Sequence, residues 1–238
     1  MSEERARPHR ILVFGAHPDD CDGSAGGTAA LWVRAGYRVR FVSLTNGSTG
    51  HHEIGGMELA RRRAAEAGAA GAVLGVEYLV MDTHSGQLEA SLERRREVIR
   101  LIREFAPDLI LGPRPWDYHP DHRYTGVLVQ DAAYVVSVPG NEPLTPALPR
   151  NPHIMYVSDA FKKPYPFTPD VAVGIDDVVD QKVRALSAHA SQVYEWLPYH
   201  AGTLAHVPPA DDEAARRGWL ATRLRARYAA VADRFRDL

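Results

Sequence analysis

The chain has little of what anchors or cross-links many other proteins. Its 238 residues include a single cysteine, Cys21, which excludes an internal disulfide framework and a cysteine-based zinc finger and fits a reducing compartment. No stretch approaches the roughly 20 apolar residues that a membrane-spanning helix requires. The charged start, Met1 to Pro8, lacks the apolar core of a signal peptide. These absences predict a cytoplasmic protein.

An excess of charge of either sign is also missing. Lysine and arginine number 28 against 30 acidic residues, so the net charge is −2 with neutral histidines. This balance argues against a nucleic-acid backbone or an anionic membrane as the main partner. With 45% hydrophobic and 24% charged residues, the composition is that of an ordinary globular protein. We expect one α/β domain over residues 1–238.

Apolar runs and segments of helical period alternate along the first half of the chain. Strands are expected at Arg10 to Gly15, Arg38 to Leu44, Glu77 to Met81 and Asp108 to Leu111. Helices are expected at Ser24 to Gly36, with Ser24 as a cap, Gly56 to Leu74, Leu92 to Phe105 and Arg123 to Val138. This alternation predicts a three-layer, Rossmann-like fold with a mostly parallel sheet flanked by helices.

The second half of the chain is less regular. Residues 139–169 contain eight of the 17 prolines, and we expect a Pro-rich loop region there rather than a separate domain. The remaining expected elements are strands at Ile154 to Ser158 and Val171 to Ile175 and helices at Asp176 to His189 and Asp211 to Phe235. Residues 1–9 are expected to form a flexible N-terminal arm.

Two clusters of histidine and aspartate follow two of the expected strands. The first is Gly15-Ala16-His17-Pro18-Asp19-Asp20 and the second is His119-Pro120-Asp121-His122. In open parallel sheets, ligands bind beyond the carboxyl ends of the strands, where the strand order reverses. If the order is the common 3-2-1-4-5, the first and fourth strands are neighbours at that point. We therefore expect the two clusters to flank one crevice.

The residue types in these clusters predict a metal centre. His17, Asp20 and His122 would supply two nitrogens and one oxygen, the three-ligand set of a catalytic zinc that keeps a fourth position for water. Iron(II) is an alternative on ligand type alone, because two histidines and one carboxylate also hold non-heme iron. The single cysteine lies outside this set, which excludes a thiolate site.

The remaining side chains of the clusters are candidates for proton transfer. A metal lowers the pKa of bound water from about 15.7 to about 7, after which a nearby carboxylate can take its proton. Asp19 is the candidate base. His119 is a candidate to donate a proton to a leaving amine or to hold the developing oxyanion, and Asp121 to orient a histidine.

Ala16 to Asp20, followed by Gly26-Gly27-Thr28 and then by His119-Pro120-Asp121-His122, resembles the LmbE-like or PIG-L superfamily of zinc-dependent N-deacetylases. The resemblance extends from Ile11 to about Gln192. It implies a Rossmann-like fold and hydrolysis of an N-acyl group, commonly the acetamide of an N-acetylglucosamine unit. It also implies Zn2+ as the cofactor, with His17, Asp20 and His122 as its ligands. Asp19 would then be the base, and His119 the histidine that holds the oxyanion or serves the leaving group.

Two further patterns resemble the same family. Arg63 falls on an Arg-x-x-Glu pattern that implies a position near the sugar, whereas a solvated helix face is the alternative. His189-Ala190-Ser191-Gln192 resembles a late His-x-Ser-Gln signature that either closes the site or caps a helix. The chain departs from the family at Asp22, where Glu is usual, and at Ser85-Gly86, where many relatives have Asp-Gly. These departures leave the expected ligands and base in place.

Other histidines and aromatic residues give weaker signals. The Gly-rich segment Asn46 to Gly56 contains His51-His52-Glu53, and we expect a mobile rim loop there rather than a second metal site. A further group predicts either an aromatic wall for a sugar or core packing: Tyr194, Trp196, Tyr199 and His200.

We therefore expect a zinc-dependent hydrolase that removes an N-acyl group, most simply N-acetyl, from an amino sugar or its conjugate. The alternatives are a mononuclear non-heme iron enzyme with the same ligands and a non-catalytic, metal-containing sugar-binding module. A nucleotide-binding Rossmann protein is excluded, because carboxylates stand where a pyrophosphate needs glycine amides. No nucleic-acid partner and no membrane span are expected, and a homo-oligomer is left open.

Overall fold

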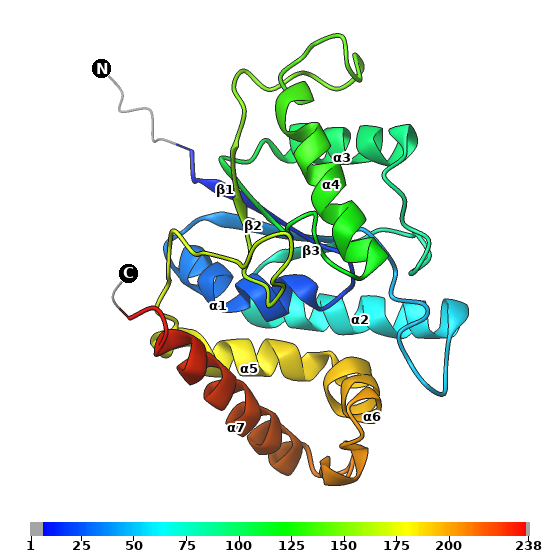
Figure 1. The fold of residues 1–238 in the computed structure, drawn as a ribbon, viewed down its shortest axis with the longest axis vertical. Coiled ribbons are helices and arrows are strands. Elements are labelled where there is room, and N and C mark those ends of the chain that lie inside the picture. The colour runs from blue at the N-terminus through cyan, green and yellow to red at the C-terminus, as the bar shows by residue number, and fades with distance from the viewer. Residues whose placement is uncertain (1–6, 237–238) are drawn as a thin grey trace.

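The computed structural model describes residues 7–236 and contains a five-stranded sheet in which every strand pair is parallel (Figure 1). The strands are β1 Arg10–Gly15, β2 Arg38–Ser43, β3 Glu77–Val80, β4 Leu109–Gly112 and β5 His153–Tyr156. Their order is β3-β2-β1-β4-β5, so β1 and β4 are neighbours. Both the predicted fold class and the predicted strand order are confirmed.

Helices cover both faces of the sheet (Figure 1). The long helices are α1 Asp20–Arg34, α2 Gly56–Leu74, α3 Leu92–Phe105, α4 Pro120–Val135, α5 Val179–Ala188 and α7 Glu213–Ala232. Helices α3 and α4 lie on one face and α1 and α2 on the other, while α5 packs outside α1 and α2 and α7 packs on α5. A π-helix, Ser191–Trp196, and a short α6, Leu197–His200, connect α5 to α7.

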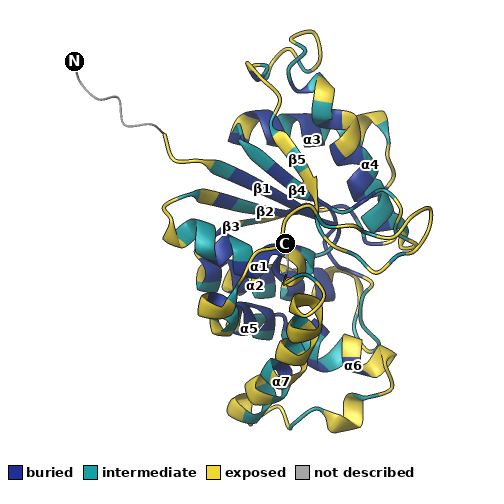
Figure 2. Ribbon diagram, turned by 60° about the vertical axis from the view of Figure 1, so that its left-hand side comes forward, coloured by how far each residue is buried: buried dark blue, intermediate teal, exposed yellow. Residues whose placement is uncertain are grey.

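The central strand β1 shows why the sheet is covered on both sides. Its side chains alternate between the faces, with Leu12 and Phe14 packed among α3 and α4 and with Ile11 and Val13 packed among α1 and α2. All four are almost completely buried. A parallel strand with apolar residues at every position requires such two-sided cover, because neither face meets water. Figure 2 shows this buried centre and a largely exposed α7.

Two helices begin earlier than the sequence predicted. Helix α1 begins at Asp20 rather than Ser24, and the Ser24 hydroxyl instead donates to the Asp20 carbonyl at 2.7 Å within the helix. Helix α4 begins at Pro120 rather than Arg123, because the His119 side chain caps it by accepting from the Asp121 amide. Both clusters therefore lie at helix starts, beyond the carboxyl ends of β1 and β4.

The predicted strand at Val171 to Ile175 is wrong. This segment has no regular structure, and Val171 and Val173 are 58% and 47% exposed. It carries the chain from β5 towards α5, and Ile175 packs against Gly27 of α1, where an added Cβ would come within 2.9 Å of its side chain. With no neighbouring strand to pair with, its β-branched residues do not form one.

The expected N-terminal arm lies partly outside the described residues, because only positions from 7 onward are described. Arg7 forms an ion pair with Asp108, with Nη2 2.7 Å from Oδ1. The Pro-rich region between α4 and β5 is held by Arg103, which donates to backbone carbonyls that include Val136 and Thr145. Within residues 7–236, no helix combines the length and apolar character needed to cross a membrane. The one-domain organisation stays a prediction.

Candidate metal centre

Three potential ligand atoms from the two clusters meet beyond the carboxyl ends of β1 and β4. His17 Nδ1 lies 3.0 Å from His122 Nε2, and Asp20 Oδ2 lies 3.6 Å from the first and 3.4 Å from the second. Ligand atoms at tetrahedral zinc, each bonded at about 2.0–2.1 Å, are about 3.3 Å from one another. The three side chains therefore already have the mutual spacing that a zinc ion requires.

The turn after β1 explains how Asp20 reaches this position. Its Oδ2 accepts hydrogen bonds from the amides of Ala16 and His17 at 2.9 and 2.8 Å. Gly15 is required at the end of the strand, because an added Cβ would lie 2.7 Å from the Asp20 Cβ. The Pro18 ring fixes φ as the chain enters the turn. The cluster thus folds back on itself and presents His17 and Asp20 together.

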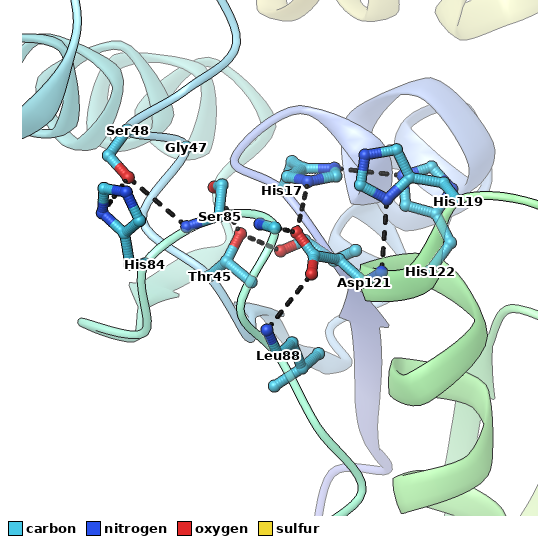
Figure 3. Close-up of polar contacts among 12 residues, drawn as sticks. His17, Thr45, Gly47, Ser48, His84, Ser85, Leu88, His119, Asp121 and His122 are labelled. Carbon is cyan, nitrogen blue, oxygen red and sulfur yellow. Dashed lines mark hydrogen bonds and ion pairs between the residues drawn. The ribbon is translucent and has the colours of Figure 1, made fainter.

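A second carboxylate holds each histidine by its other ring nitrogen, and Figure 3 shows the pair of Asp121 with His17. Asp121 Oδ2 lies 3.1 Å from His17 Nε2, and Asp121 is fully buried. Asp117 Oδ2 lies 2.9 Å from His122 Nδ1. Such partners fix the tautomer and the ring orientation of metal-binding histidines. Sequence reasoning missed Asp117, whose signal was a carboxylate two residues before His119.

The loop after β3 donates hydrogen bonds to Asp121, and the loop after β2 packs against it through Thr45 (Figure 3). The amides of Gly86 and Leu88 donate to its two oxygens at 2.6 and 3.3 Å. Ser85 is buried, and its Oγ lies 2.9 Å from Thr45 Oγ1. Ser85 therefore braces the loop whose amides hold Asp121.

The carboxylates give this centre a strong preference for positive charge. Burial alone would lower the pKa of His17, but its bonds to Asp121 and Asp20 outweigh burial and raise the pKa to about 9. The pKa of His122 is also raised, because the Asp20 charge and the Asp117 bond outweigh burial. Despite its burial, the pKa of Asp20 is held well below its usual range by His122 and His17. A group of side chains that retains protons on its imidazoles is one that favours a cation.

His119 lies beside the ligand atoms with a different orientation. Its Nδ1 accepts from the Asp121 amide at 3.2 Å, so the neutral ring carries its proton on Nε2. Burial, followed by repulsion from His17 and His122, lowers the pKa of His119. His17, His119 and His122 also bring one nitrogen each within 4.8 Å of one another, which makes His119 a rival third ligand. Asp20 Oδ2, at 3.6 and 3.4 Å from the two histidine nitrogens, has the spacing of a zinc ligand, which favours the carboxylate.

Asp19 lies next to the ligands and is held by Arg63. Arg63 Nη2 donates to Asp19 Oδ1 at 2.8 Å, and Arg63 is only 2% exposed. Gly47 gives the guanidinium room, because an added Cβ there would come within 2.6 Å of Arg63 Cδ. The alternative of a solvated Arg63 is wrong. Its contacts favour the positioning of Asp19 over the substrate contact that the resemblance implied.

Hydrogen bonds join the Arg-x-x-Glu pattern of Arg63 to the His-x-Ser-Gln pattern of His189. Glu66 accepts from the amide and the hydroxyl of Ser191 at 2.9 and 2.6 Å. Gln192 Nε2 donates to the Gly50 carbonyl at 3.0 Å. We call the Asn46 to Gly56 loop together with the Ser191–Trp196 π-helix and α6 the closing wall. The His-x-Ser-Gln segment therefore holds the Asn46 to Gly56 loop in place through Gln192.

Stacked rings complete the closing wall. His51 Nε2 lies 2.9 Å from Glu195 Oε2, and Glu195 also pairs with Arg62. The His52 and Tyr199 rings stack with centroids 3.9 Å apart and planes 7° apart.

Asp22, the other departure from the family, is fully buried with its Oδ2 3.0 Å from His189 Nε2. In the part of the chain that is described, the one grouping of potential metal ligands contains neither His51 nor His52.

Comparisons with known proteins show the family to which the chain belongs. The family model described as PIG-L, GlcNAc-PI de-N-acetylase, matches residues 12–133. A diacetylchitobiose deacetylase from Thermococcus kodakarensis is 33% identical over 80% of this chain and 74% of its own length. The structure of an N,N'-diacetylchitobiose deacetylase from Pyrococcus horikoshii superposes with a TM-score of 0.69 and 29% identity, covering 77% of this chain and 70% of that one.

A structure with a different activity is equally similar in fold. The 4-carboxy-2-hydroxymuconate hydratase from Pseudomonas putida superposes with a TM-score of 0.71 and 25% identity. The match covers 83% of this chain and 85% of the hydratase. The architecture alone therefore does not separate amide hydrolysis from addition of water to a double bond.

Proposed function

Because this chain belongs to the PIG-L family of GlcNAc-PI de-N-acetylases, we propose that it is a zinc-dependent deacetylase that hydrolyses the N-acetyl group of an amino sugar or its conjugate. The observation that carries this proposal is the 3.0–3.6 Å spacing of His17 Nδ1, His122 Nε2 and Asp20 Oδ2. These three atoms would hold the metal.

When bound, zinc supplies a water of lowered pKa, about 7, and polarises the amide carbonyl. The protein's own contribution begins with Asp121 and Asp117, which accept the N–H groups of His17 and His122 and so keep the other ring nitrogens aimed at one point. Without those two carboxylates, either ring is free to rotate or to change tautomer.

Asp19 is proposed as the base. Its Oδ1 is held by Arg63, so Oδ2 takes the proton of the attacking water. As the water oxygen bonds to the carbonyl carbon, the Nε2–H of His119 donates a hydrogen bond to the carbonyl oxygen, which becomes negatively charged. The carbon–nitrogen bond then breaks, and Asp19 returns its proton to the departing amine. Acetic acid and a free amino sugar are the products, and the acid then loses its proton to solvent to give acetate.

The proposal is tested by measuring acetate and free amine released from N-acetylglucosamine and from N,N'-diacetylchitobiose. Protein loaded with zinc, protein loaded with iron and protein treated with a chelator are compared, with and without oxygen. We expect release with zinc, none after chelation and no dependence on oxygen. Oxygen-dependent turnover with iron would identify the oxygenase alternative, and metal binding without any turnover would support the sugar-binding module.

A hydratase is the second candidate, because the Pseudomonas putida hydratase has the same fold at a TM-score of 0.71. Both reactions need an activated water and a base, and the metal centre offers both. The higher identity of the deacetylase relative, 33%, favours amide hydrolysis. Following the absorbance of 4-carboxy-2-hydroxymuconate in the presence of the zinc-loaded protein separates the two, since only a hydratase consumes it.

A further inference from the structure

A cavity separate from the metal centre lies between the end of α5 and the start of α7. Its volume is about 370 Å³, which is large enough for a small metabolite. Figure 1 shows that α5 and α7 diverge towards α6, and residues of both helices line the cavity. The full lining consists of Val73, Arg184, Ser187, Ala188, Ala190, Tyr194, Ala210, Glu213, Arg216 and Arg217. None of these residues belongs to the metal centre.

Positive charge dominates the lining of this cavity. It includes three guanidinium groups and a single carboxylate, that of Glu213. Arg217 Nη2 lies 3.7 Å from Glu213 Oε2, and this pair is weak because the Glu213 side chain is 86% exposed. Among residues 7–236, Arg184 and Arg216 form no ion pair. Two positive charges at the cavity are therefore left without a counter-charge.

Arg216 is held in place by contacts that leave part of its guanidinium unused. Its Nε donates to the Pro208 carbonyl at 3.0 Å, and the guanidinium carbon lies 5.1 Å from the centroid of the Tyr194 ring. Tyr194 is only 3% exposed, and its hydroxyl lies 2.7 Å from Ser187 Oγ. Within the described part of the chain, Nη1 and Nη2 of Arg216 donate no hydrogen bond. A ligand can use these nitrogens at a small entropic cost, because the side chain is already ordered.

These groups match the chemistry of a phosphate ester. Guanidinium groups bind phosphate and carboxylate oxygens through paired hydrogen bonds. A phosphate monoester carries a charge of about −1.5 to −2 at pH 7, whereas one carboxylate carries −1. Two uncompensated guanidinium groups are therefore balanced better by a phosphate. The apolar part of the lining, Val73 with Ala188, Ala190 and Ala210, leaves room for the organic part of such a ligand.

We propose that this cavity binds the phosphate group of a small molecule through Arg184, Arg216 and Arg217. The site is additional to the proposed deacetylase centre, and it does not depend on which reaction that centre catalyses. Its ligand joins α5 to α7, because Arg184 belongs to α5 and the other two arginines to α7.

The π-helix connects this phosphate site to the closing wall. Tyr194 lines the cavity, whereas Ser191 and Glu195 of the same π-helix bind Glu66 and Arg62. A ligand that contacts Arg216 and Tyr194 therefore also stabilises the segment that carries the closing wall. Because binding to the folded state alone shifts the unfolding equilibrium, the ligand should raise the unfolding temperature.

The test measures the binding of glucose 6-phosphate and of inorganic phosphate to the zinc-loaded protein by calorimetry. We expect glucose 6-phosphate to bind more tightly, because only the ester contacts the apolar part of the lining. Arg184→Gln should raise its dissociation constant about tenfold, through the loss of one charged hydrogen-bonding group. This variant should fold normally, because Arg184 is exposed and forms no ion pair within residues 7–236.

Arg223→Gln is the matched control. Arg223 is an exposed arginine of α7 that does not line the cavity, so its replacement removes the same charge without touching the site. Its dissociation constant for glucose 6-phosphate should equal that of the wild type. The rise in unfolding temperature with glucose 6-phosphate is measured for the same proteins at constant ionic strength. It should be retained in Arg223→Gln and reduced in Arg184→Gln.

The possible outcomes separate the sources of the phosphate and can overturn the site. Equal affinity for both probes, with the same loss in Arg184→Gln, would support the site with inorganic phosphate as its ligand. Equal affinity of Arg184→Gln and wild type would overturn it, because the anion would then bind elsewhere, such as at the zinc. Equal losses in Arg184→Gln and Arg223→Gln would reduce it to general attraction by the arginines of α7. The absence of binding by either probe at about 10 mM would also overturn it.

Discussion

The metal centre and the closing wall lie on either side of Asp19, yet the chain builds them in opposite ways. The ligands and their carboxylate partners come from two short segments, His17–Asp20 and Asp117–His122, placed by adjacent strands. The closing wall joins residues that lie far apart in the chain, such as His51 with Glu195 and Glu66 with Ser191. The proposed metal ligands and their carboxylate partners therefore come from short segments of the sequence. The support around Asp19 and Arg63 depends instead on contacts between residues that are far apart in the chain.

This difference predicts that variants of the two regions fail in different ways. Changes in the three proposed ligands should abolish metal binding or turnover with little loss of stability, since His17, Asp20 and His122 are all partly exposed. Changes in the closing wall should lower stability while the metal stays bound. Variants of the metal centre and of the closing wall can therefore be compared by their zinc content, their turnover and their free energy of unfolding.

The largest effect is expected for His122→Ala. Removal of one of three ligands should leave little zinc bound and lower kcat/KM by at least about 10³-fold, because several kcal/mol of transition-state stabilisation is lost. Metal content by mass spectrometry and amine release are measured on the same preparation. Stoichiometric zinc in this variant would remove His122 from the ligand set.

Asp19→Asn should separate metal binding from catalysis. Zinc content is expected to stay at the wild-type level, while kcat falls by about 10²–10⁴-fold with the loss of the base. Arg63→Lys is the companion variant, expected to lower kcat less, because it disturbs only the orientation of Asp19. Wild-type turnover in Asp19→Asn would mean that another group removes the proton.

Asp121→Asn tests the carboxylate that orients His17. Loss of this partner is expected to weaken zinc binding by about 10–100-fold, as measured by competition with a chromogenic chelator. The buried position of Asp121 adds some loss of stability, so unfolding is measured alongside. An unchanged affinity would show that the Gly86 and Leu88 amides hold an asparagine equally well.

The smallest effect is expected in the closing wall. Burial alone would raise the pKa of Glu195, but its bonds to Arg62 and His51 lower it below the usual value. The stabilisation from this carboxylate is therefore present above its unfolded pKa and is lost as the pH falls through the folded one. Glu195→Gln should cost about 1 kcal/mol of unfolding free energy at pH 7, and the difference should shrink below about pH 4.5.

Glu53→Gln provides the control for that measurement, because the Glu53 side chain is 75% exposed and lies 3.9 Å from His52. Its effect should stay within about 0.5 kcal/mol at every pH. Urea unfolding at several pH values, with zinc content measured in parallel, compares the pair. Loss of zinc in Glu195→Gln would break the separation between the two regions.

The same comparison explains what the sequence predicted. His17, Asp20 and His122 could be grouped because each follows an apolar strand, and parallel strands end at one edge of the sheet. Asp19 and His119 came with them as neighbours in the motifs. The positions of these side chains needed no knowledge of distant contacts.

The rest depended on contacts that no local pattern reveals. Glu195 meets Arg62 across 133 positions of the chain, and nothing near either residue indicates the other. Arg63 carried a recognisable pattern, but its burial against Asp19 depends on how α2 packs. The Val171 to Ile175 segment has the composition of a strand and lacks a partner strand, which only the topology decides.

His17, Asp20 and His122 are proposed to form one zinc centre, with Asp19 and His119 left free for catalysis. Anomalous diffraction at the zinc edge from crystals of the zinc-loaded protein would locate the metal. We expect a single peak bonded to His17 Nδ1, His122 Nε2 and Asp20 Oδ2. A peak bonded to His119 in place of Asp20, or the absence of a peak beyond the carboxyl ends of β1 and β4, would contradict this ligand set.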